Sequence, residues 1–306
     1  MIPPAENAFQ LGSARRCSDL GTALSDTERI SLMNPIRGDN RESPEYSVKS
    51  NVQRLYDRFY PVQNDGYRWR DGSKTFYQWI RSVPGLATAN VLNVGAGPTP
   101  TPALRRLRGE VGRLAGVDID PIVVTNADLD EAHVTDGVSL PFNDGEFDIV
   151  YSDWTIEHVE RPKPFLVEIR RVLKHGGTFV FRTTNLRHYV TLISAHTPYW
   201  FHKLTAKGFT ARDSGAHRRW PTFYRMNTPA AVRRYLAEAG FDQINLQLIE
   251  PAPSYLAFNA LTFRLGVAYE RLVNRWTWSS RFRLILIARA RANESQLHHV
   301  ALENRW

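Results

Sequence analysis

The sequence is poor in cysteine, because Cys17 is the only one among 306 residues. A single thiol excludes an internal disulfide framework and a zinc site built from several cysteines, and we predict no metal site. Long apolar segments are lacking as well, since no run reaches the 18 or more residues of a membrane-spanning helix. The first residues hold no continuous apolar stretch, so no secretory signal peptide is predicted. A reducing, cytoplasmic location is the simplest expectation.

The composition is that of a folded protein with a basic balance. Hydrophobic residues make up 42% and charged residues 23%, which allows a sizeable packed core. The net charge of +8, from 39 basic and 31 acidic residues, excludes an acidic disordered class and permits an anionic partner. The length suits one large domain or two small ones.

The distribution of residue types predicts a main domain with additions at both ends. Residues 1–45 are rich in Ser, Pro, Asn, Asp and Arg and predict a mobile leader. Aromatic residues become frequent in 46–89, where we expect one or two helices that form an N-terminal cap. The main domain is expected to span 90–295, and a short tail, 296–306, follows it.

Strand-like and helix-like segments alternate through the main domain. The expected strands are 90–94, 113–118, 147–152, 178–183, 241–249 and 281–290. The expected helices are 101–108, 161–177, 228–240 and 256–275. This alternation predicts an α/β fold with a mostly parallel sheet covered by helices on both faces. Ligands of such sheets bind outside the carboxyl ends of the strands.

Capping residues define the expected ends of three helices. Thr101 and Thr228 are predicted N-caps, each followed by a proline at the first helical position, where the missing N–H costs nothing. Gly240 is expected to stop the helix that Thr228 begins. Gly176 and Gly177 are expected to end the preceding helix in the manner of a left-handed C-cap.

The stretch VLNVGAGPTP, residues 91–100, places two glycines directly after an apolar strand, a pattern typical of a nucleotide-binding turn. The dinucleotide fingerprint needs a third glycine where Pro100 stands, so a pyrophosphate ligand and a nicotinamide oxidoreductase are disfavoured. Asp118 follows Gly95 by 23 residues, about the spacing at which an acidic residue accepts ribose hydroxyls. A ribose without a pyrophosphate suggests S-adenosyl-L-methionine.

Four motifs then occur in register: VLNVGAGPTP, GVDID, DGVSLPFNDGEFDIVYSDWTIEHV and LVEIRRVLKHGGTFVFRTTN. With them the chain resembles the class I S-adenosylmethionine-dependent methyltransferases, specifically the type 11 group, most strongly over 91–185. The resemblance implies a Rossmann-like sheet of seven mostly parallel strands with an antiparallel last strand. It also implies S-adenosyl-L-methionine as the cofactor, and it says almost nothing about the methyl acceptor.

The resemblance also assigns roles to individual residues. The backbone of Gly95, Ala96 and Gly97 would approach the methionine part of the cofactor, beside Asn93, which stands where the family usually has Asp. The remaining expected contacts are Asp118 for the ribose hydroxyls, Ile119 for an adenine face, Asp136 beside Gly137 for the adenine amino group, and Ser152 and Asp153 for the methionine end and the reacting methyl. Asp118 alone could instead be a cap or a surface acid, and Asp136 a turn former.

The expected catalytic residues are His158 and Asp153. His158 follows the strand that reaches the methyl site, and a neutral imidazole there could take a proton from an acceptor hydroxyl near pH 7. The alternative is that His158 only orders the strand-to-helix loop by hydrogen bonding.

The segment 186–226 is long for a connection between a strand and a helix, where ~2–6 residues is normal. It is rich in aromatic and basic residues, so we expect a substrate lid, with His188, Trp220 and Tyr224 as substrate-binding residues. A packed structural excursion is the alternative.

The expected partner is a small-molecule, sugar or lipid-linked acceptor, as in secondary metabolism, methylated on oxygen or nitrogen. Between 254 and 291 the chain has seven arginines against one acid, and two tryptophans follow an apolar stripe. This pattern suggests a peripheral membrane contact, with an ordinary packed helix as the alternative. No nucleic acid partner is expected, although an RNA methyltransferase and a non-catalytic binding protein with this fold stay open as alternative functions.

Overall fold

A computed structural model describes residues 51–63, 72–100, 103–196 and 220–293, all within one compact unit, Lys49–Trp306. The predicted leader, the tail, Cys17, the predicted cap Thr101 and residues 197–219 of the predicted lid lie outside the described residues. Over these described ranges, none of the helices combines the length and apolar character that crossing a bilayer requires.

The described residues form a seven-stranded sheet in the order β3-β2-β1-β4-β5-β7-β6. Its strands are β1 (Asn90–Val94), β2 (Arg113–Asp118), β3 (Glu131–Val134), β4 (Phe147–Asp153), β5 (Leu173–Thr184), β6 (Phe241–Ile249) and β7 (Ile285–Ala292). The pairs from β3 through β5 are parallel, and β7 runs antiparallel to both of its neighbours. The predicted Rossmann-like sheet with an antiparallel last strand is therefore confirmed.

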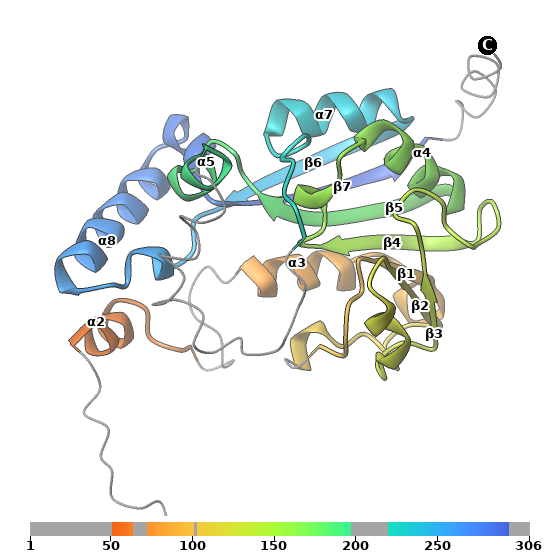
Figure 1. Cartoon of the computed structure of the whole chain (residues 1–306), viewed down its shortest axis with the longest axis horizontal. Helices are drawn as coiled ribbons and strands as arrows, with labels where there is room; N and C mark the ends of the chain where they lie inside the picture. Colours follow the sequence, from red (N-terminus) through yellow and green to blue (C-terminus); the bar gives the residue numbers. More distant parts are fainter. Residues whose placement is uncertain (1–50, 64–71, 101–102, 197–219, 294–306) are drawn as a thin grey trace, which may run out of the picture. The chain divides into compact units, whose positions relative to one another are not determined.

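Helices cover both faces of this sheet (Figure 1). On one face α4 (Pro162–Val172) and α7 (Pro229–Glu238) pack their apolar residues against the strands. On the other face α3 (Gly72–Arg81) does so with Phe76, Tyr77 and Ile80. Burial from both sides explains why β1, β2 and β4 are nearly continuous apolar runs.

Three sequence-based boundaries were wrong: the end of the helix now called α4, the start of β5 and the start of β7. One strand was missed. The helix of 161–177 ends at Val172, because Leu173 already pairs with Phe147 as the start of β5, so Gly176 and Gly177 lie in a strand. The last strand begins at Ile285 rather than 281. Strand β3 was missed because its four residues are only half-buried and show no apolar run.

The helix expected at 101–108 is in the described part only the single 3₁₀ turn Ala103–Arg105. Only 18 residues separate β1 from β2, and Pro98 and Pro100 supply no backbone donors there. In its described residues this crossover therefore forms a short 3₁₀ turn rather than the predicted helix. By contrast, the cap at Thr228 is confirmed, since its side chain accepts a hydrogen bond from the backbone N–H of Ala231 at 3.2 Å.

The remaining helices are α2 (Asn51–Phe59), α5 (Tyr189–His196) and α8 (Ala260–Arg275). Helix α2 packs on α8 through Tyr56 and Phe263, whose ring centroids are 5.5 Å apart. Helix α5 packs on α8 through Tyr189 and Tyr269, 4.9 Å apart (Figure 1). The helical N-terminal extension is thus present, with α3 on the sheet and α2 on α8.

Candidate cofactor and active site

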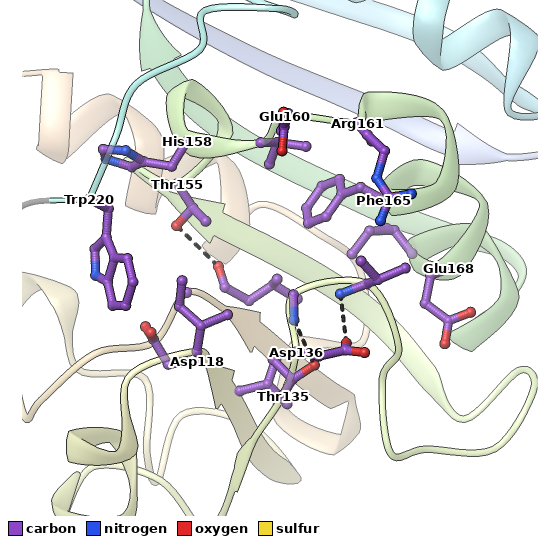
Figure 2. Close-up of a pocket in the computed structure, with 18 of the residues that line it drawn as sticks. Asp118, Thr135, Asp136, Thr155, His158, Glu160, Arg161, Phe165, Glu168 and Trp220 are labelled. Carbon is purple, nitrogen blue, oxygen red and sulfur yellow. Dashed lines mark hydrogen bonds between the residues drawn. The ribbon is translucent and has the colours of Figure 1, made fainter.

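A cavity of about 450 Å³ opens at the carboxyl ends of β1, β2 and β4. Its lining includes residues from five separate loops, and Figure 2 shows Asp118, Asp136, His158 and Trp220 around the same space. Eight of the predicted site residues line it: Gly95, Asp118, Ile119, Asp136, Gly137, Asp153, His158 and Trp220. The topology therefore brings the dispersed motifs together at the edge where parallel sheets bind ligands.

The glycine turn, residues 95–97, separates this cavity from a second one, and Gly95 lines both. Gly95 has φ +80° and Gly97 φ +56°, in the left-handed region that favours glycine. The backbone N–H groups of Gly95 and Ala96 both donate to the carbonyl of Val117, at 2.8 and 3.0 Å. A Cβ on Gly95 would lie 2.0 Å from the Thr155 hydroxyl, whereas a Cβ on Gly97 would meet open space. The turn therefore leaves room for a ligand above its second glycine.

These contacts predict different costs for the same substitution at the two glycines. We expect Gly95→Ala to lower the free energy of unfolding by about 2–3 kcal/mol, since left-handed strain adds to the overlap with Thr155. Gly97→Ala should cost only the strain, about 1 kcal/mol. Urea unfolding of both variants measures the difference, and equal losses would contradict the described turn.

The Asp118 carboxylate is fixed at the end of β2 by two backbone donors. Its Oδ2 accepts from Gly97 N at 2.9 Å, and its Oδ1 accepts from Asp120 N at 2.9 Å. A carboxylate has about four acceptor positions, so each oxygen keeps capacity for a further donor. A bidentate partner with two hydroxyl groups fits this arrangement.

Asp136 shapes the loop that follows β3. Its Oδ1 accepts from Val138 N at 2.9 Å and from Ser139 N at 2.8 Å, and these backbone donors lower the pKa of the carboxyl. Asp136 therefore does form a turn, as the alternative interpretation expected, through its Oδ1 atom. Because Asp136 also lines the cavity, its second oxygen remains compatible with a donor such as an adenine amino group.

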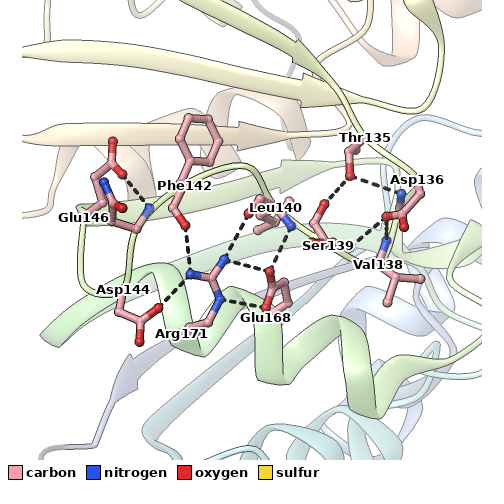
Figure 3. Close-up of polar contacts among 12 residues, drawn as sticks. Thr135, Asp136, Val138, Ser139, Leu140, Phe142, Asp144, Glu146, Glu168 and Arg171 are labelled. Atoms are coloured by element: carbon pink, nitrogen blue, oxygen red, sulfur yellow. Dashed lines mark hydrogen bonds and ion pairs between the residues drawn. The ribbon is translucent and has the colours of Figure 1, made fainter.

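Arg171 of α4 ties the same loop to the helix (Figure 3). Its guanidinium donates to the carbonyls of Phe142 and Leu140, at 2.8 and 3.0 Å, and to both oxygens of Glu168, at 2.8 and 2.7 Å. Glu168 in turn accepts from Leu140 N at 2.9 Å, and the Arg171 pairing lowers the pKa of its carboxyl. The loop that carries Asp136 is therefore held in place by these contacts with α4.

A second cavity, of about 420 Å³, lies on the other side of the glycine turn. Asn93 and Ala96 line it, and Gly95 and Asp153 line both cavities. The Oδ1 atom of Asn93 is buried and accepts no hydrogen bond from the described residues. Buried acceptors are normally paired with a donor. This oxygen is therefore available for a ligand donor, on the side of the turn where the resemblance places the methionine ammonium.

Asp153, at the end of β4, is held by a buried arginine. Arg182 of β5 is 1% exposed and pairs with both Asp153 oxygens, and Tyr77 OH donates to Oδ2 at 3.0 Å. Burial, followed by the Asp153 charge, raises the pKa of Tyr77. The guanidinium also lies 4.9 Å from the Trp154 ring, and Trp154 has φ +58°. These contacts fix the Asp153 carboxylate with its charge compensated.

His158 belongs to a 3₁₀ turn, η4 (Ile156–His158), directly after β4. Its Nδ1 lies 2.8 Å from the carbonyl oxygen of Pro221. Because a carbonyl only accepts, Nδ1 carries the proton in the neutral ring, and the lone pair is on Nε2. This single bond therefore orders the loop and selects the tautomer that can accept a proton.

The central part of the chain is similar to a known family of domains. Residues 92–181 match the family described as "Methyltransferase domain", type 11. The chain carries a class I S-adenosylmethionine-dependent methyltransferase domain. S-Adenosyl-L-methionine is accordingly its cofactor.

Three relatives are similar to this methyltransferase. A ubiquinone biosynthesis O-methyltransferase of Maricaulis maris is 25% identical over 203 residues, 58% of this chain and 72% of the relative. A demethylmenaquinone methyltransferase of Bacillus subtilis is 27% identical over 192 residues, 56% and 78%. A probable methyltransferase of Aspergillus luteorubrus is 30% identical over 179 residues, which are 51% of this chain and 58% of the relative.

Four predicted site residues, Gly97, Ser152, His188 and Tyr224, lie outside the lining of both cavities. The Ser152 side chain is fully buried in the sheet. His188 is buried too, where its Nδ1 accepts from Val190 N and its Nε2 donates to Glu250, both at 3.2 Å. The Tyr224 hydroxyl lies 3.3 Å from Ser194 Oγ, and its backbone N–H donates to the Glu157 carbonyl. The predicted ligand contacts of these three side chains gain no support from their positions.

Other residues of the methyltransferase site were missed in the sequence. Thr155 and Phe165 line the first cavity, and Tyr77 and Arg105 line the second. Thr155 lies within the quoted motif and could have been found there, whereas Tyr77 comes from the N-terminal helix and carries no motif signal. Within the described ranges, histidine, cysteine and acidic residues nowhere gather in groups of three that could hold a metal ion.

Proposed function

We propose that this methyltransferase acts on an oxygen or nitrogen of a small or lipid-linked acceptor, with a hydroxyl favoured. The observation that carries the proposal is His158, whose Nδ1–H is committed to Pro221 while the ring lines the cavity. Deprotonation by a positioned base contributes typically ~10²–10⁴-fold when the acceptor is a hydroxyl. The name of the Maricaulis relative, an O-methyltransferase, supports the same choice.

The cofactor is proposed to span the glycine turn. Asp118 would hold the ribose hydroxyls, Ile119 and Asp136 the adenine, and Gly97 would let the backbone approach closely. The buried Oδ1 of Asn93 would accept from the methionine ammonium, which fits the unmet acceptor described above. An amide carries no charge, so this contact is weaker than the one an aspartate at position 93 would make.

S-Adenosylmethionine supplies a methyl group already activated by its sulfonium, so the protein's main task is alignment. His158 Nε2 would take the proton of the acceptor hydroxyl as the O–C bond forms and the bond between the sulfonium and its methyl group breaks, with S-adenosylhomocysteine as the leaving group. Asp153 is held by Arg182 and Tyr77 and therefore acts as a positioning residue at the methyl site rather than as the base. Trp220 and Phe223 give the acceptor side of the cavity an apolar aromatic wall.

Two measurements test this proposal on the full chain. Calorimetry should detect S-adenosylmethionine binding, and a cofactor that fails to bind at millimolar concentration would contradict the site. Release of S-adenosylhomocysteine is then followed with matched acceptors: a catechol, the same catechol with an alkyl tail, its aniline counterpart and a glycoside. Turnover of the hydroxyl compounds above the aniline supports the proposal, whereas turnover of the aniline alone overturns the preference for oxygen.

The proposed location is cytoplasmic and membrane-peripheral. Of the arginines noted in the C-terminal part, Arg264, Arg271 and Arg275 belong to α8 and Arg281 to the turn after it, η6 (Trp278–Phe282), and the two tryptophans lie where α8 gives way to η6. Their arrangement supports a contact with a membrane surface, at which a lipid-linked acceptor would be available.

A further inference from the structure

One face of helix α8 is exposed along its whole length. Leu261, Leu265 and Leu272 are 68%, 60% and 46% exposed, which is unusual for large apolar residues that share one helix face. The other exposed residues of the helix interior fall on the same side at intervals of three and four: Arg264, Ala268, Arg271 and Arg275. We call these seven residues the outer face of α8.

The outer face is purely basic in its charge. The only acidic residue of α8, Glu270, points inward, is 1% exposed, and accepts from Tyr60 OH at 3.2 Å. Arg271 lies 3.4 Å from that carboxylate, so its charge is partly balanced from within. Arg264, between Leu261 and Leu265, and Arg275, at the end of the helix beyond Leu272, add two further positive charges to this face.

An aromatic pair closes the end of the outer face. Trp276 and Trp278 are both exposed, and their rings stack with centroids 6.0 Å apart and an interplanar angle of 16°. The Arg275 guanidinium lies 5.8 Å from the Trp276 ring. Tryptophan beside arginine at the end of an apolar stripe is the composition found at membrane–water interfaces.

The fold does not depend on the outer face. Helix α8 is held by its inner residues Phe263, Val267 and Val273, all buried, and by a capping box between Asn259 and Thr262. Among the described residues the exposed leucines thus contribute little to the core, so this face is available for docking.

We propose that the outer face of α8, with Trp276 and Trp278, docks on a membrane that contains anionic lipids. Leucines and tryptophans would enter the headgroup boundary while the arginines pair with lipid phosphates. A second copy of the chain fits less well, because a two-fold contact between such faces would set arginines against arginines. The inference rests on the membrane-peripheral part of the proposed function, and it does not depend on the chemistry of the acceptor.

Vesicle sedimentation with the full chain tests the proposal. The wild-type chain should bind vesicles of 30% phosphatidylglycerol in phosphatidylcholine and bind pure phosphatidylcholine at least ~10-fold more weakly, since each basic residue at an anionic surface adds affinity. Leu261→Asp/Leu265→Asp and Arg264→Glu/Arg275→Glu should each weaken binding to the anionic vesicles by ~10-fold or more. Val124→Asp, which places one such acidic residue at a 63% exposed valine on the 3₁₀ turn after β2, is the control to be compared with the single variant Leu265→Asp, and it should bind as wild type.

Three outcomes would overturn the docking surface. They are no vesicle binding by the wild type, equal binding to both vesicle types, or a wild-type dimer in solution that Leu261→Asp/Leu265→Asp converts to monomers. Calorimetry with S-adenosylmethionine separates this result from the proposed catalytic site. All α8 variants should keep the wild-type cofactor affinity. A failure of vesicle binding would therefore leave the proposed cofactor site intact, and a failure of cofactor binding would leave the docking surface intact.

Discussion

Replacing Asp118 with alanine is expected to weaken S-adenosylmethionine binding at least ~100-fold, the largest effect on cofactor affinity that we predict. Hydrogen bonds to a charged group contribute about 1.5–3 kcal/mol each, and both proposed ribose contacts are lost. The variant also removes the acceptor of the Gly97 N–H, which holds the glycine turn against β2. A combined loss near 3 kcal/mol corresponds to roughly 150-fold in Kd.

Asp120→Ala is the matched control for this experiment. Asp120 lies two residues further on and caps the 3₁₀ turn η3 (Pro121–Thr125) by accepting from Ile122 N at 3.1 Å, but it does not line the cavity. Calorimetry should give Asp120→Ala a Kd within a few-fold of wild type. An unchanged Kd in Asp118→Ala, or equal losses in the two variants, would remove the specific ribose role from Asp118.

Much of the fold could be predicted because local patterns and tertiary packing agree. The buried parallel strand 90–94 is a short apolar run, the antiparallel edge strand 241–249 alternates between apolar and polar residues, and a threonine followed by proline marks the start of α7. The errors arise where packing overrides a local signal. The glycines after α4 resemble a helix cap, but pairing of Leu173 with Phe147 extends β5 backward over them.

The candidate site divides in the same way. Residues within a motif, such as Gly95 and Asp118, could be placed because their spacing along the chain reflects a short turn and a single crossover. The ion pair between Asp153 and Arg182 joins neighbouring strands, and Tyr77 reaches it from 76 positions earlier in the chain. No local pattern encodes such a contact, so the sequence predicted Asp153 as catalytic without revealing the arginine that compensates its charge.

His158→Ala is expected to lower kcat by ~10²–10⁴-fold with a hydroxyl acceptor, while the Kd for S-adenosylmethionine stays within a few-fold of wild type. The reason is that Nε2 is proposed to act only on the acceptor's proton, whereas the proposed cofactor contacts come from β1, β2 and the loop after β3. Single-turnover methyl transfer with the best hydroxyl compound of the acceptor panel, at saturating cofactor, measures the chemical step.

His196→Ala is the control, because His196 Nδ1 also lies 2.8 Å from a carbonyl oxygen, that of Leu192, away from both cavities. If His158→Ala keeps its rate but loses thermal stability, the imidazole only orders the loop through Pro221. A fall in rate without a fall in either cofactor affinity or acceptor affinity supports action of the imidazole on the acceptor's proton, since an altered loop would also move Trp220 and Phe223, which flank Pro221.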